Sequence, residues 1–369
     1  MRVLFIISSL GLGGLEKQVV DLVRGLDPSR VESRTLVFNP GGERLRDMQK
    51  SGMAVSEAGG GSAHRFVSRW KAIRRECLAF RPHIIVAFDI AAALYMISTV
   101  GRRKDIFRIA YFGAGTISTP KAHLAFRCLH PFLDRIIANS HRGAEYLRRS
   151  FGIGADRGGV ICNGLDVDAM NHPWTPVGSL RKELSIPDHV PLVGLIGKLD
   201  WFKDPMNLAM AAAMVRRQVP DVEFCFIGFG PLHEEVSAYL ATQNLTAHFH
   251  LVPQRPDAPW LAGEFTIGAL CSRSEGLPNV VLEYMYWSLP CVVTDTGECG
   301  RLVADGETGY VVPPRNPEAL ANAILRHLSD PERARAMGRK GRQRLEERYS
   351  IQRFIREFQD VFDSGTSAE

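Results

Sequence analysis

Buried-strand patterns recur along the whole chain. The first, residues 2–8, is an almost unbroken apolar run, typical of a strand covered by helices on both faces of a parallel sheet. Residues 16–26 follow, with apolar side chains at helical spacing. Further strands are predicted at 33–38, 83–88, 108–112, 135–139 and 159–162. This alternation of strands and helices predicts a doubly wound parallel sheet.

A second α/β series follows a proline-containing stretch, 172–178, which is expected to lead into a linker. Strands are predicted at 191–196, 222–227, 249–252, 267–270, 290–294 and 310–312, with helices at 208–218, 232–242 and 279–287 and a largely helical end from 317 to 362. The chain is therefore expected to form two Rossmann-like domains, 1–175 and 189–345, and a terminal helix within 346–369. Ligands of such sheets bind beyond the carboxyl ends of the strands, so two sheets facing each other would place two substrates in one cleft.

Composition places the chain among globular proteins, since 45% of its residues are hydrophobic and 23% charged. Its seven cysteines show no paired spacing, which favours buried free thiols in a reducing compartment over disulfides or a zinc site. The apolar start is broken by glycines and followed by Glu16 and Lys17, so a first strand is expected rather than a signal peptide. The apolar run 84–100 contains Asp89 and is short for a membrane span. A cytoplasmic protein is predicted.

Charge is distributed unevenly. Residues 1–170 hold 25 Lys and Arg against 15 Asp and Glu, whereas the remainder holds 20 against 25. The basic half is expected to meet an anionic partner or surface. Within it, residues 65–81 contain six cations, one acid and apolar side chains at helical spacing. Two interpretations stay open: a helix on an anionic membrane, and a core-packed helix with a solvated basic face. No recognition motif for nucleic acid accompanies the charge.

The richest candidate site lies between a predicted strand and a predicted helix. Pro278 suits the first turn of that helix, because the amide hydrogen that it lacks would have had no intrahelical partner. The backbone amides of 277–280 and the helix dipole can bind a phosphate. Glu275 precedes the helix and Glu283 lies one to two turns into it, so one carboxylate can face a sugar and the other a ribose. The alternative is an ordinary acid before a helix and a solvated helix residue.

Two lysines form the second candidate site. Lys198 and Lys203 follow a predicted strand and can converge on a diphosphate, offsetting its charge without a metal. The alternative is a pair of exposed surface lysines. A third feature, the turn containing Gly11, Gly13 and Gly14, lets backbone approach a ligand. Its spacing is not that of the dinucleotide fingerprint and no acid follows the second strand, so an NAD enzyme is not expected.

In combination these features resemble glycosyltransferase family 4. The segments that carry the resemblance occur in that family's order over residues 1–312. They are the glycine turn with Glu16, residues 137–140, residues 160–166, the Lys198/Lys203 loop, residues 227–231, and Glu275 with seven residues before Glu283. The combination is more specific than any one motif.

The resemblance implies the GT-B fold, with the last helix crossing back to the first domain, retention of the anomeric configuration, and no metal or other cofactor. It implies that Lys198 and Lys203 bind the diphosphate, and that Glu275 contacts the donor sugar and supports the transition state. It also implies that Glu283 holds the ribose and that the Gly13–Gly14 turn closes over the phosphates and faces the acceptor. Glu275 and Lys203 are the candidate catalytic residues. The donor site would comprise Gly13, Gly14, Lys198, Lys203, Gly276, Leu277, Pro278, Asn279, Val280 and Glu283. Glu16 and Arg108 are the candidate acceptor residues.

The implied function is transfer of a sugar from a nucleotide-diphosphate sugar, with a UDP-sugar favoured, to an acceptor hydroxyl. The positive charge of the first half and the basic segment 65–81 lead to the hypothesis that the acceptor is a lipid-linked or cell-envelope glycan, reached at the inner face of the membrane. The sequence departs from the family in residues 108–116, which lack the His that many relatives carry there, and at Pro253, Thr266 and Arg301. A nucleotide-sugar epimerase of similar build and a non-catalytic glycan-binding relative remain as alternatives.

Overall fold

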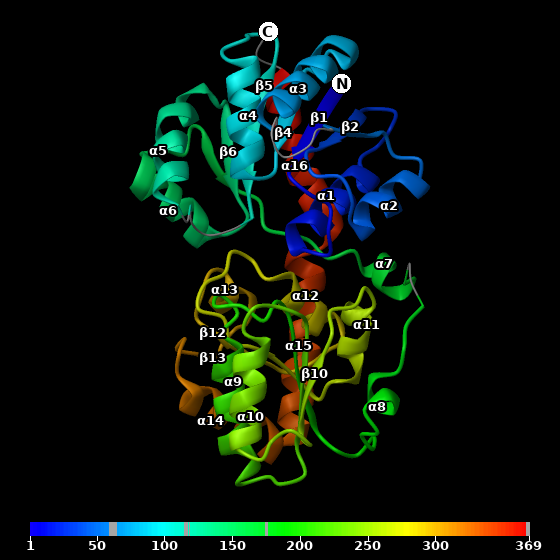
Figure 1. Cartoon of the computed structure of the whole chain (residues 1–369), viewed down its shortest axis with the longest axis vertical. Helices are drawn as coiled ribbons and strands as arrows, with labels where there is room; N and C mark the ends of the chain where they lie inside the picture. Colours follow the sequence, from blue (N-terminus) through cyan, green and yellow to red (C-terminus); the bar gives the residue numbers. More distant parts are fainter. Residues whose placement is uncertain (59–64, 114–116, 118, 174–175, 367–369) are drawn as a thin grey trace. The chain divides into compact units, whose positions relative to one another are not determined.

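The computed structural model describes residues 1–369 except 59–64, 114–116, 118, 174–175, 367–369 and the side chain of Arg65. The chain divides into two compact units (Figure 1). The first contains Met1–Gly164 and Ile351–Glu369, and the second contains Leu165–Ser350. Residues 165–173, expected in the first domain, thus group with the second unit. The predicted limits at 175 and 369 lie outside the described residues, as do residues 114–116 of the segment lacking a His.

The first unit is built on a seven-stranded parallel sheet of order β3-β2-β1-β4-β5-β6-β7. Its strands are β1 (Arg2–Ile7), β2 (Glu32–Val37), β3 (Val55–Glu57), β4 (Ile84–Ala87), β5 (Phe107–Phe112), β6 (Arg135–Ala138) and β7 (Gly158–Val160). The sequence predicted all of them except β3. That edge strand has three residues, Val-Ser-Glu, and so contains no apolar run that could reveal it.

Helices surround this sheet. They are α1 (Gly14–Gly25), α2 (Glu43–Lys50), α3 (Arg65–Phe80), α4 (Ile90–Val100), α5 (Pro120–Leu129), the 3-10 helix η2 (His130–Phe132), α6 (His141–Phe151) and α16 (Ile351–Thr366). From α16, Phe354, Phe358 and Phe362 pack in the same core cluster as Phe88 and Tyr111. The C-terminal helix therefore completes the first unit, which confirms the implied return of the chain.

The second unit contains a six-stranded parallel sheet of order β10-β9-β8-β11-β12-β13. Its strands are β8 (Leu192–Ile196), β9 (Glu223–Ile227), β10 (Phe249–Val252), β11 (Ile267–Leu270), β12 (Cys291–Thr294) and β13 (Gly309–Val312). Its helices are α7 (Val167–Asn171), α8 (Leu180–Glu183), α9 (Pro205–Arg216), α10 (His233–Thr242), α11 (Ala258–Leu261), η3 (Ala262–Glu264), α12 (Asn279–Tyr286), α13 (Cys299–Leu302), α14 (Pro317–Ser329) and α15 (Pro331–Arg348). Every strand predicted for this half is present, because each is mostly apolar.

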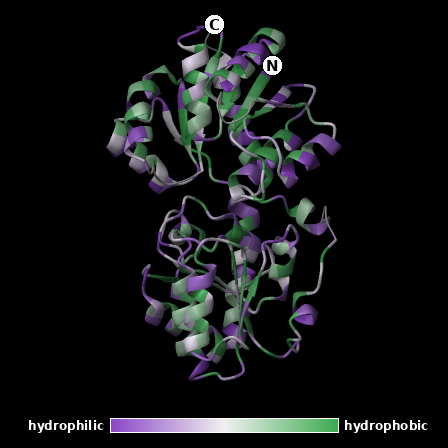
Figure 2. Ribbon diagram, viewed as in Figure 1, coloured by the Kyte–Doolittle hydropathy of each residue, from purple (hydrophilic) through white to green (hydrophobic). Residues whose placement is uncertain are grey.

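The apolar residues of both units gather on the strands and the inner helix faces (Figure 2). Six cysteines are buried free thiols, as predicted, and Cys128 is exposed. Burial raises the pKa of the Cys77 thiol to about 11 and that of Cys299 to about 12, so both are protonated and unreactive at neutral pH. Among the helices that the structure describes, none is long and apolar enough to span a membrane.

Candidate functional site

Each sheet has one point at which its strand order reverses. The order of the first sheet reverses between β1 and β4, and that of the second sheet reverses between β8 and β11. In open α/β sheets, ligands bind in the crevice beyond the carboxyl ends of the two strands at this switch point. The loops that leave these four strands are therefore the expected binding regions of each unit.

A lysine–glutamate pair joins the two loops at the switch point of the second sheet. Lys203 follows β8 and Glu275 follows β11, and Lys203 Nζ lies 2.5 Å from Glu275 Oε1. The side chains are 23% and 10% exposed. Burial lowers the pKa of the Lys203 ammonium, but the charge and hydrogen bond of Glu275 outweigh burial, so the pKa lies above its usual value. Lys203 is therefore a fixed positive charge at neutral pH.

The loop after β8 is held by backbone contacts. The Asp200 carboxylate accepts hydrogen bonds from the backbone amides of Phe202 and Lys203, each at 3.0 Å. On the neighbouring loop after β9, a Cβ at Gly228 would lie 1.7 Å from the carbonyl oxygen of Gly197. Only glycine permits such an approach of two loops. These contacts fix the backbone from which the Lys203 side chain projects.

The turn that carries Glu275 is equally constrained. Ser272 Oγ donates to Glu275 Oε1 at 2.5 Å, and the Ser272 carbonyl accepts from Thr294 Oγ1, at the end of β12, at 2.7 Å. Gly297 has a positive φ of 54°, and a Cβ there would lie 2.4 Å from the Glu275 carbonyl oxygen. Glu275 Oε1 thus contacts both Ser272 and Lys203, so its carboxylate is held in one orientation.

Lys198 lies on the same loop as Lys203 in a different environment. Its side chain is 67% exposed, and its Nζ lies 3.9 Å from Asp200 Oδ2. An ion pair with this exposure and separation is weak. Within the described part of the second unit, Lys198 forms no ion pair with Glu275. The structure therefore brings Lys203 and Glu275 together and leaves Lys198 able to reorient.

Helix α12 begins directly after the Glu275 turn. Pro278 is its N-cap residue with a φ of −77°, and a proline offers no side-chain oxygen to the first-turn amides. The carbonyl of Gly276 accepts a hydrogen bond from the Glu298 amide at 2.8 Å, which ties this turn to the loop after β12. Leu277, Asn279 and Val280 are buried. Glu283, the fifth residue of α12, is 6% exposed, so it is not the solvated helix residue of the alternative interpretation.

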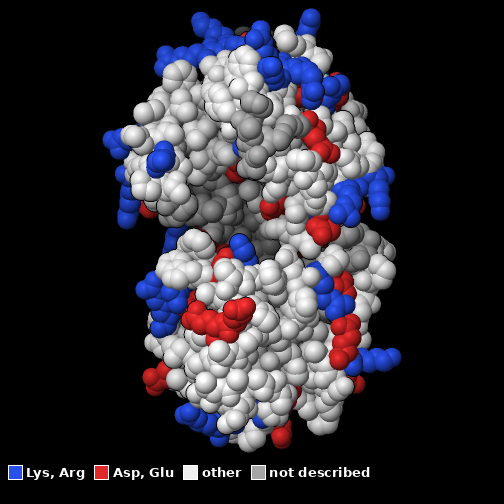
Figure 3. Space-filling view, viewed as in Figure 1, with Lys and Arg blue, Asp and Glu red and all other residues white. Residues whose placement is uncertain are grey.

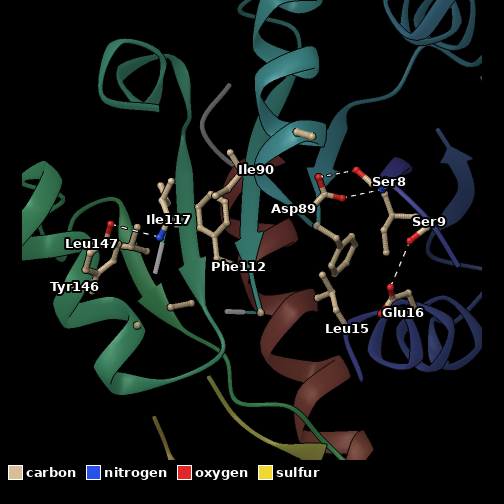
Figure 4. Close-up of a pocket in the computed structure, with 16 residues that line it drawn as sticks. Ser8, Ser9, Leu15, Glu16, Asp89, Ile90, Phe112, Ile117, Tyr146 and Leu147 are labelled. Atoms are coloured by element: carbon tan, nitrogen blue, oxygen red, sulfur yellow. Dashed lines mark hydrogen bonds between the residues drawn. The ribbon is translucent and has the colours of Figure 1, made fainter. Parts of the chain in front are cut away.

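In the first unit, a cavity of about 420 Å³ lies at the switch point between β1 and β4 (Figure 4). Asp89, which follows β4, accepts hydrogen bonds from the Ser8 amide at 2.7 Å, the Ser8 hydroxyl at 2.9 Å and the Ala92 amide at 2.8 Å. Most of the lining is apolar. Asp89 therefore joins the ends of β1 and β4 and caps α4.

The predicted glycine turn and Glu16 lie at the edge of this cavity. Gly13 is the N-cap residue of α1, and Gly13 and Gly14 are exposed. Glu16 lies in the first turn of α1, where the helix dipole favours an acid, and it accepts a long hydrogen bond of 3.5 Å from Ser9 Oγ. A Cβ at Gly13 would lie 2.1 Å from Glu16 Oε2. Glu16 thus lines the cavity from α1.

Arg108 does not belong to this region. It lies near the start of β5, at the edge opposite to the carboxyl ends of the strands, and is 8% exposed. Its Nε and Nη2 donate to Asp134 at 2.8 and 3.0 Å, and its Nη1 donates to the Gly101 carbonyl at 2.5 Å. The structure therefore uses the Arg108 guanidinium inside the fold and does not bring it to the cavity that Glu16 lines.

Several residues that shape the site were not predicted. Asp200 carries a local signal, since Asp often bonds the backbone amide two residues on, here that of Phe202. Ser272 carries none, because its bond to Glu275 depends on the conformation of the turn. Trp201 and Phe202 are half exposed beside Lys203, and the Arg273 guanidinium lies 5.0 Å from the Trp201 ring centre.

Comparison with known proteins identifies the family. A model described as Glycosyltransferase Family 4 matches residues 12–169, and one described as Glycosyl transferases group 1 matches residues 178–344. The chain is 25% identical over 207 residues to an Escherichia coli protein named UDP-Gal:alpha-D-GlcNAc-diphosphoundecaprenol alpha-1,3-galactosyltransferase, covering 55% of this chain and 53% of that one. It is 27% identical over 270 residues to a GDP-mannose-dependent alpha-(1-6)-phosphatidylinositol monomannoside mannosyltransferase of Mycolicibacterium smegmatis, covering 70% of each.

Solved structures share the fold. Anabaena HepE, in complex with UDP-glucose, superposes with a TM-score of 0.84 at 19% identity, covering 99% of this chain and 100% of that one. Sucrose-phosphate synthase from Thermosynechococcus elongatus gives a TM-score of 0.84 at 17% identity over the whole of both chains. The chain spans about half the length of several curated relatives that it matches. Together, the two family models and the paired parallel sheets show that the chain belongs to glycosyltransferase family 4 and has the two-domain, Rossmann-like GT-B fold.

Proposed function

We propose that this chain transfers a sugar from a nucleotide-diphosphate sugar to an acceptor hydroxyl with retention of the anomeric configuration. A UDP-sugar is the favoured donor. The observation that carries the proposal is the Lys203–Glu275 pair at the switch point of the second sheet, directly before α12. The names of the relatives support a nucleotide-sugar donor. Some of these names give a UDP-linked donor and one gives a GDP-linked donor, so the panel of donors tested below includes both nucleotides.

The chemistry follows from where charge develops. As the bond from the anomeric carbon to the diphosphate breaks, negative charge grows on the departing diphosphate, and the acceptor oxygen bonds to the same face of that carbon. The acceptor proton passes to a diphosphate oxygen. Lys203 has three N–H donors, of which one contacts Glu275, so others can reach the diphosphate. Lys198 and the start of α12 add positive potential, and Glu283 would accept from the ribose hydroxyls.

Two further features belong to the proposal. Lys198 and Lys203 provide the positive charge that a divalent cation provides in other transferases, so turnover should be unaffected by EDTA. Glu275 would contact the donor sugar and stabilise the developing positive charge on its ring. Because its Oε1 is already bonded to Lys203 and Ser272, it is better placed for this role than for nucleophilic attack.

The proposed acceptor is a lipid-linked or cell-envelope glycan at the inner face of the membrane. The names of the two relatives include a diphosphoundecaprenol and a phosphatidylinositol mannoside. In α3, Ile73, Cys77 and Phe80 are packed in the core, whereas Phe66 and Val67 are 60% and 48% exposed. Lys and Arg gather over the part of the first unit where α3 lies (Figure 3). Exposed apolar and cationic side chains on one helix suit an anionic bilayer surface.

The donor assignment is tested by incubating the purified chain with a panel of UDP- and GDP-sugars and following slow donor hydrolysis. One donor should be consumed at least tenfold faster than the others, with and without EDTA, and NMR should show release of the anomer that the donor carried. Release of the opposite anomer would refute retention. Appearance of an altered free sugar without any transfer would instead support an epimerase.

Membrane contact is tested by flotation with vesicles of phosphatidylcholine, with and without about 30 mol% phosphatidylglycerol. The chain should float only with the anionic lipid, and the double variant Phe66→Ser, Val67→Ser should float several-fold less. Leu124, on α5, is 65% exposed and provides the matched control Leu124→Ser. Equal flotation of all three proteins, or none with anionic lipid, contradicts the proposed role of α3.

A further inference from the structure

We infer that the cavity between the ends of β1 and β4 binds an uncharged, apolar group of the acceptor, its aglycone or lipid portion. This inference rests on the proposed function, since it specifies the class of acceptor for the same reaction. It concerns a part of the acceptor that enters the first unit rather than staying in a bilayer.

The lining of the cavity favours an apolar group. Large apolar side chains from α1, α4, α6, the end of β5 and the segments after β4 and β5 surround it. They are Leu15, Ile90, Phe112, Ile117 and Leu147 (Figure 4), together with Phe88. Leu15, Ile90 and Ile117 are only partly buried, although side chains of this kind are usually covered in a folded domain. A ligand that covers them removes apolar surface from water, and this drives binding.

The polar groups of the cavity argue against a phosphate or a bare sugar. Both oxygens of Asp89 are already bonded, to the Ser8 amide and hydroxyl and to the Ala92 amide. Glu16 is the second acid, and the lining residues that the structure describes include no Lys, Arg or His. An anionic group would therefore meet carboxylates without a compensating cation. A sugar ring would need several donors and acceptors, most of which Asp89 cannot supply.

The size of the cavity fits a substantial group. Its volume is about 420 Å³, within the usual range of ligand pockets. An apolar cavity of roughly 150 Å³ is known to hold one benzene molecule, so this one can accept a group of roughly ten to fifteen carbon atoms. Glu16 and Ser9 lie together at one side of the cavity, where they can bond the sugar hydroxyls that adjoin the aglycone (Figure 4).

The test compares two probes that differ only in their apolar part, n-octyl and methyl β-D-glucopyranoside, titrated into the full chain below the micelle concentration. Ala91 is partly buried on α4 and lines the cavity, so Ala91→Phe should fill it. Ser98, exposed on the same helix, provides the control Ser98→Phe. UDP titration of every variant reports separately on the donor site in the second unit.

Octyl glucoside should bind at least tenfold more tightly than methyl glucoside, and Ala91→Phe should remove at least tenfold of that affinity. Ser98→Phe should retain octyl glucoside binding, and all variants should bind UDP within about twofold of the unmodified chain. Equal affinity for the two glucosides, or an Ala91→Phe variant that binds octyl glucoside normally, overturns the inference. Failure of the unmodified chain to bind any nucleotide counts against the proposed function instead, and leaves the comparison of the glucosides decisive for the cavity.

Discussion

Replacing Lys203 with Met should lower both the stability of the fold and the rate of turnover. The ammonium lies 2.5 Å from Glu275 Oε1, and the Glu275 side chain is 10% exposed. Without Lys203, this mostly buried carboxylate keeps the Ser272 hydrogen bond but loses its cation, at a cost of about 1–3 kcal/mol in the free energy of unfolding. Turnover should fall at least about a hundredfold, equivalent to about 2.7 kcal/mol of transition-state stabilisation, because the departing diphosphate loses the same cation.

The double variant Lys203→Met, Glu275→Gln distinguishes the two effects. A neutral amide at 275 needs no cation, so most of the lost stability should return, whereas turnover should remain at or below that of the single variant. Arg216→Met is the matched control. Arg216 Nη1 lies 3.8 Å from Glu223 Oε1, with both side chains 14% exposed, and Glu223 is at the amino end of β9, away from the carboxyl ends where Lys203 and Glu275 lie. The variant Arg216→Met should be less stable than the unmodified chain but keep its turnover.

The assays are urea unfolding followed by circular dichroism, and initial rates of donor consumption with the preferred nucleotide sugar. Turnover of Lys203→Met within about threefold of the unmodified chain would refute the diphosphate role. Turnover that recovers together with stability in the double variant would show that the pair only maintains the loop. Either result would refute the proposal that Lys203 and Glu275 act in turnover, without bearing on the fold.

Three further predictions concern the framework around the site. Gly228→Ala should cost about 1–3 kcal/mol in urea unfolding and slow donor consumption, because its Cβ would lie 1.7 Å from the Gly197 carbonyl oxygen, whereas Gly159→Ala, with open space around it, should be close to neutral. Burial lowers the pKa of His327 to about 4. The contribution of this neutral side chain to the free energy of unfolding is therefore complete above its ordinary pKa near 6.5 and is lost as pH falls towards 4. The variant His327→Phe should lack about 3 kcal/mol of this pH-dependent change. Arg108→Met should lower the melting temperature through loss of the Asp134 and Gly101 contacts and leave the KM for acceptor unchanged, and a raised acceptor KM at normal stability would restore Arg108 to the acceptor site.

The sequence predicted what depends on local pattern and missed what depends on distant contacts. Strands such as β1 and β11 are apolar runs bounded by turns, so their positions could be predicted, whereas β3 has no such run. Lys203 and Glu275 were singled out from their positions after predicted strands, and the family resemblance implied their roles. Their contact could not be predicted, because it joins loops 72 residues apart. Arg108 illustrates the converse: a cation in a basic half looks available for a ligand until its contacts with Asp134 are known.

The contacts of Glu275 reconcile two opposite electrostatic requirements of the proposed reaction. A diphosphate needs cations nearby, and the developing positive charge on the sugar ring needs an anion nearby, yet a free carboxylate beside the diphosphate would repel it. Both the Lys203 and the Ser272 hydrogen bonds fall on Oε1, so that oxygen is largely neutralised on the side of the lysine. Oε2 takes part in neither bond and can carry the charge that faces the sugar. The pair thus places one cation and one anion side by side where two loops meet, which suits the proposed reaction, in which opposite charges separate over the length of one breaking bond.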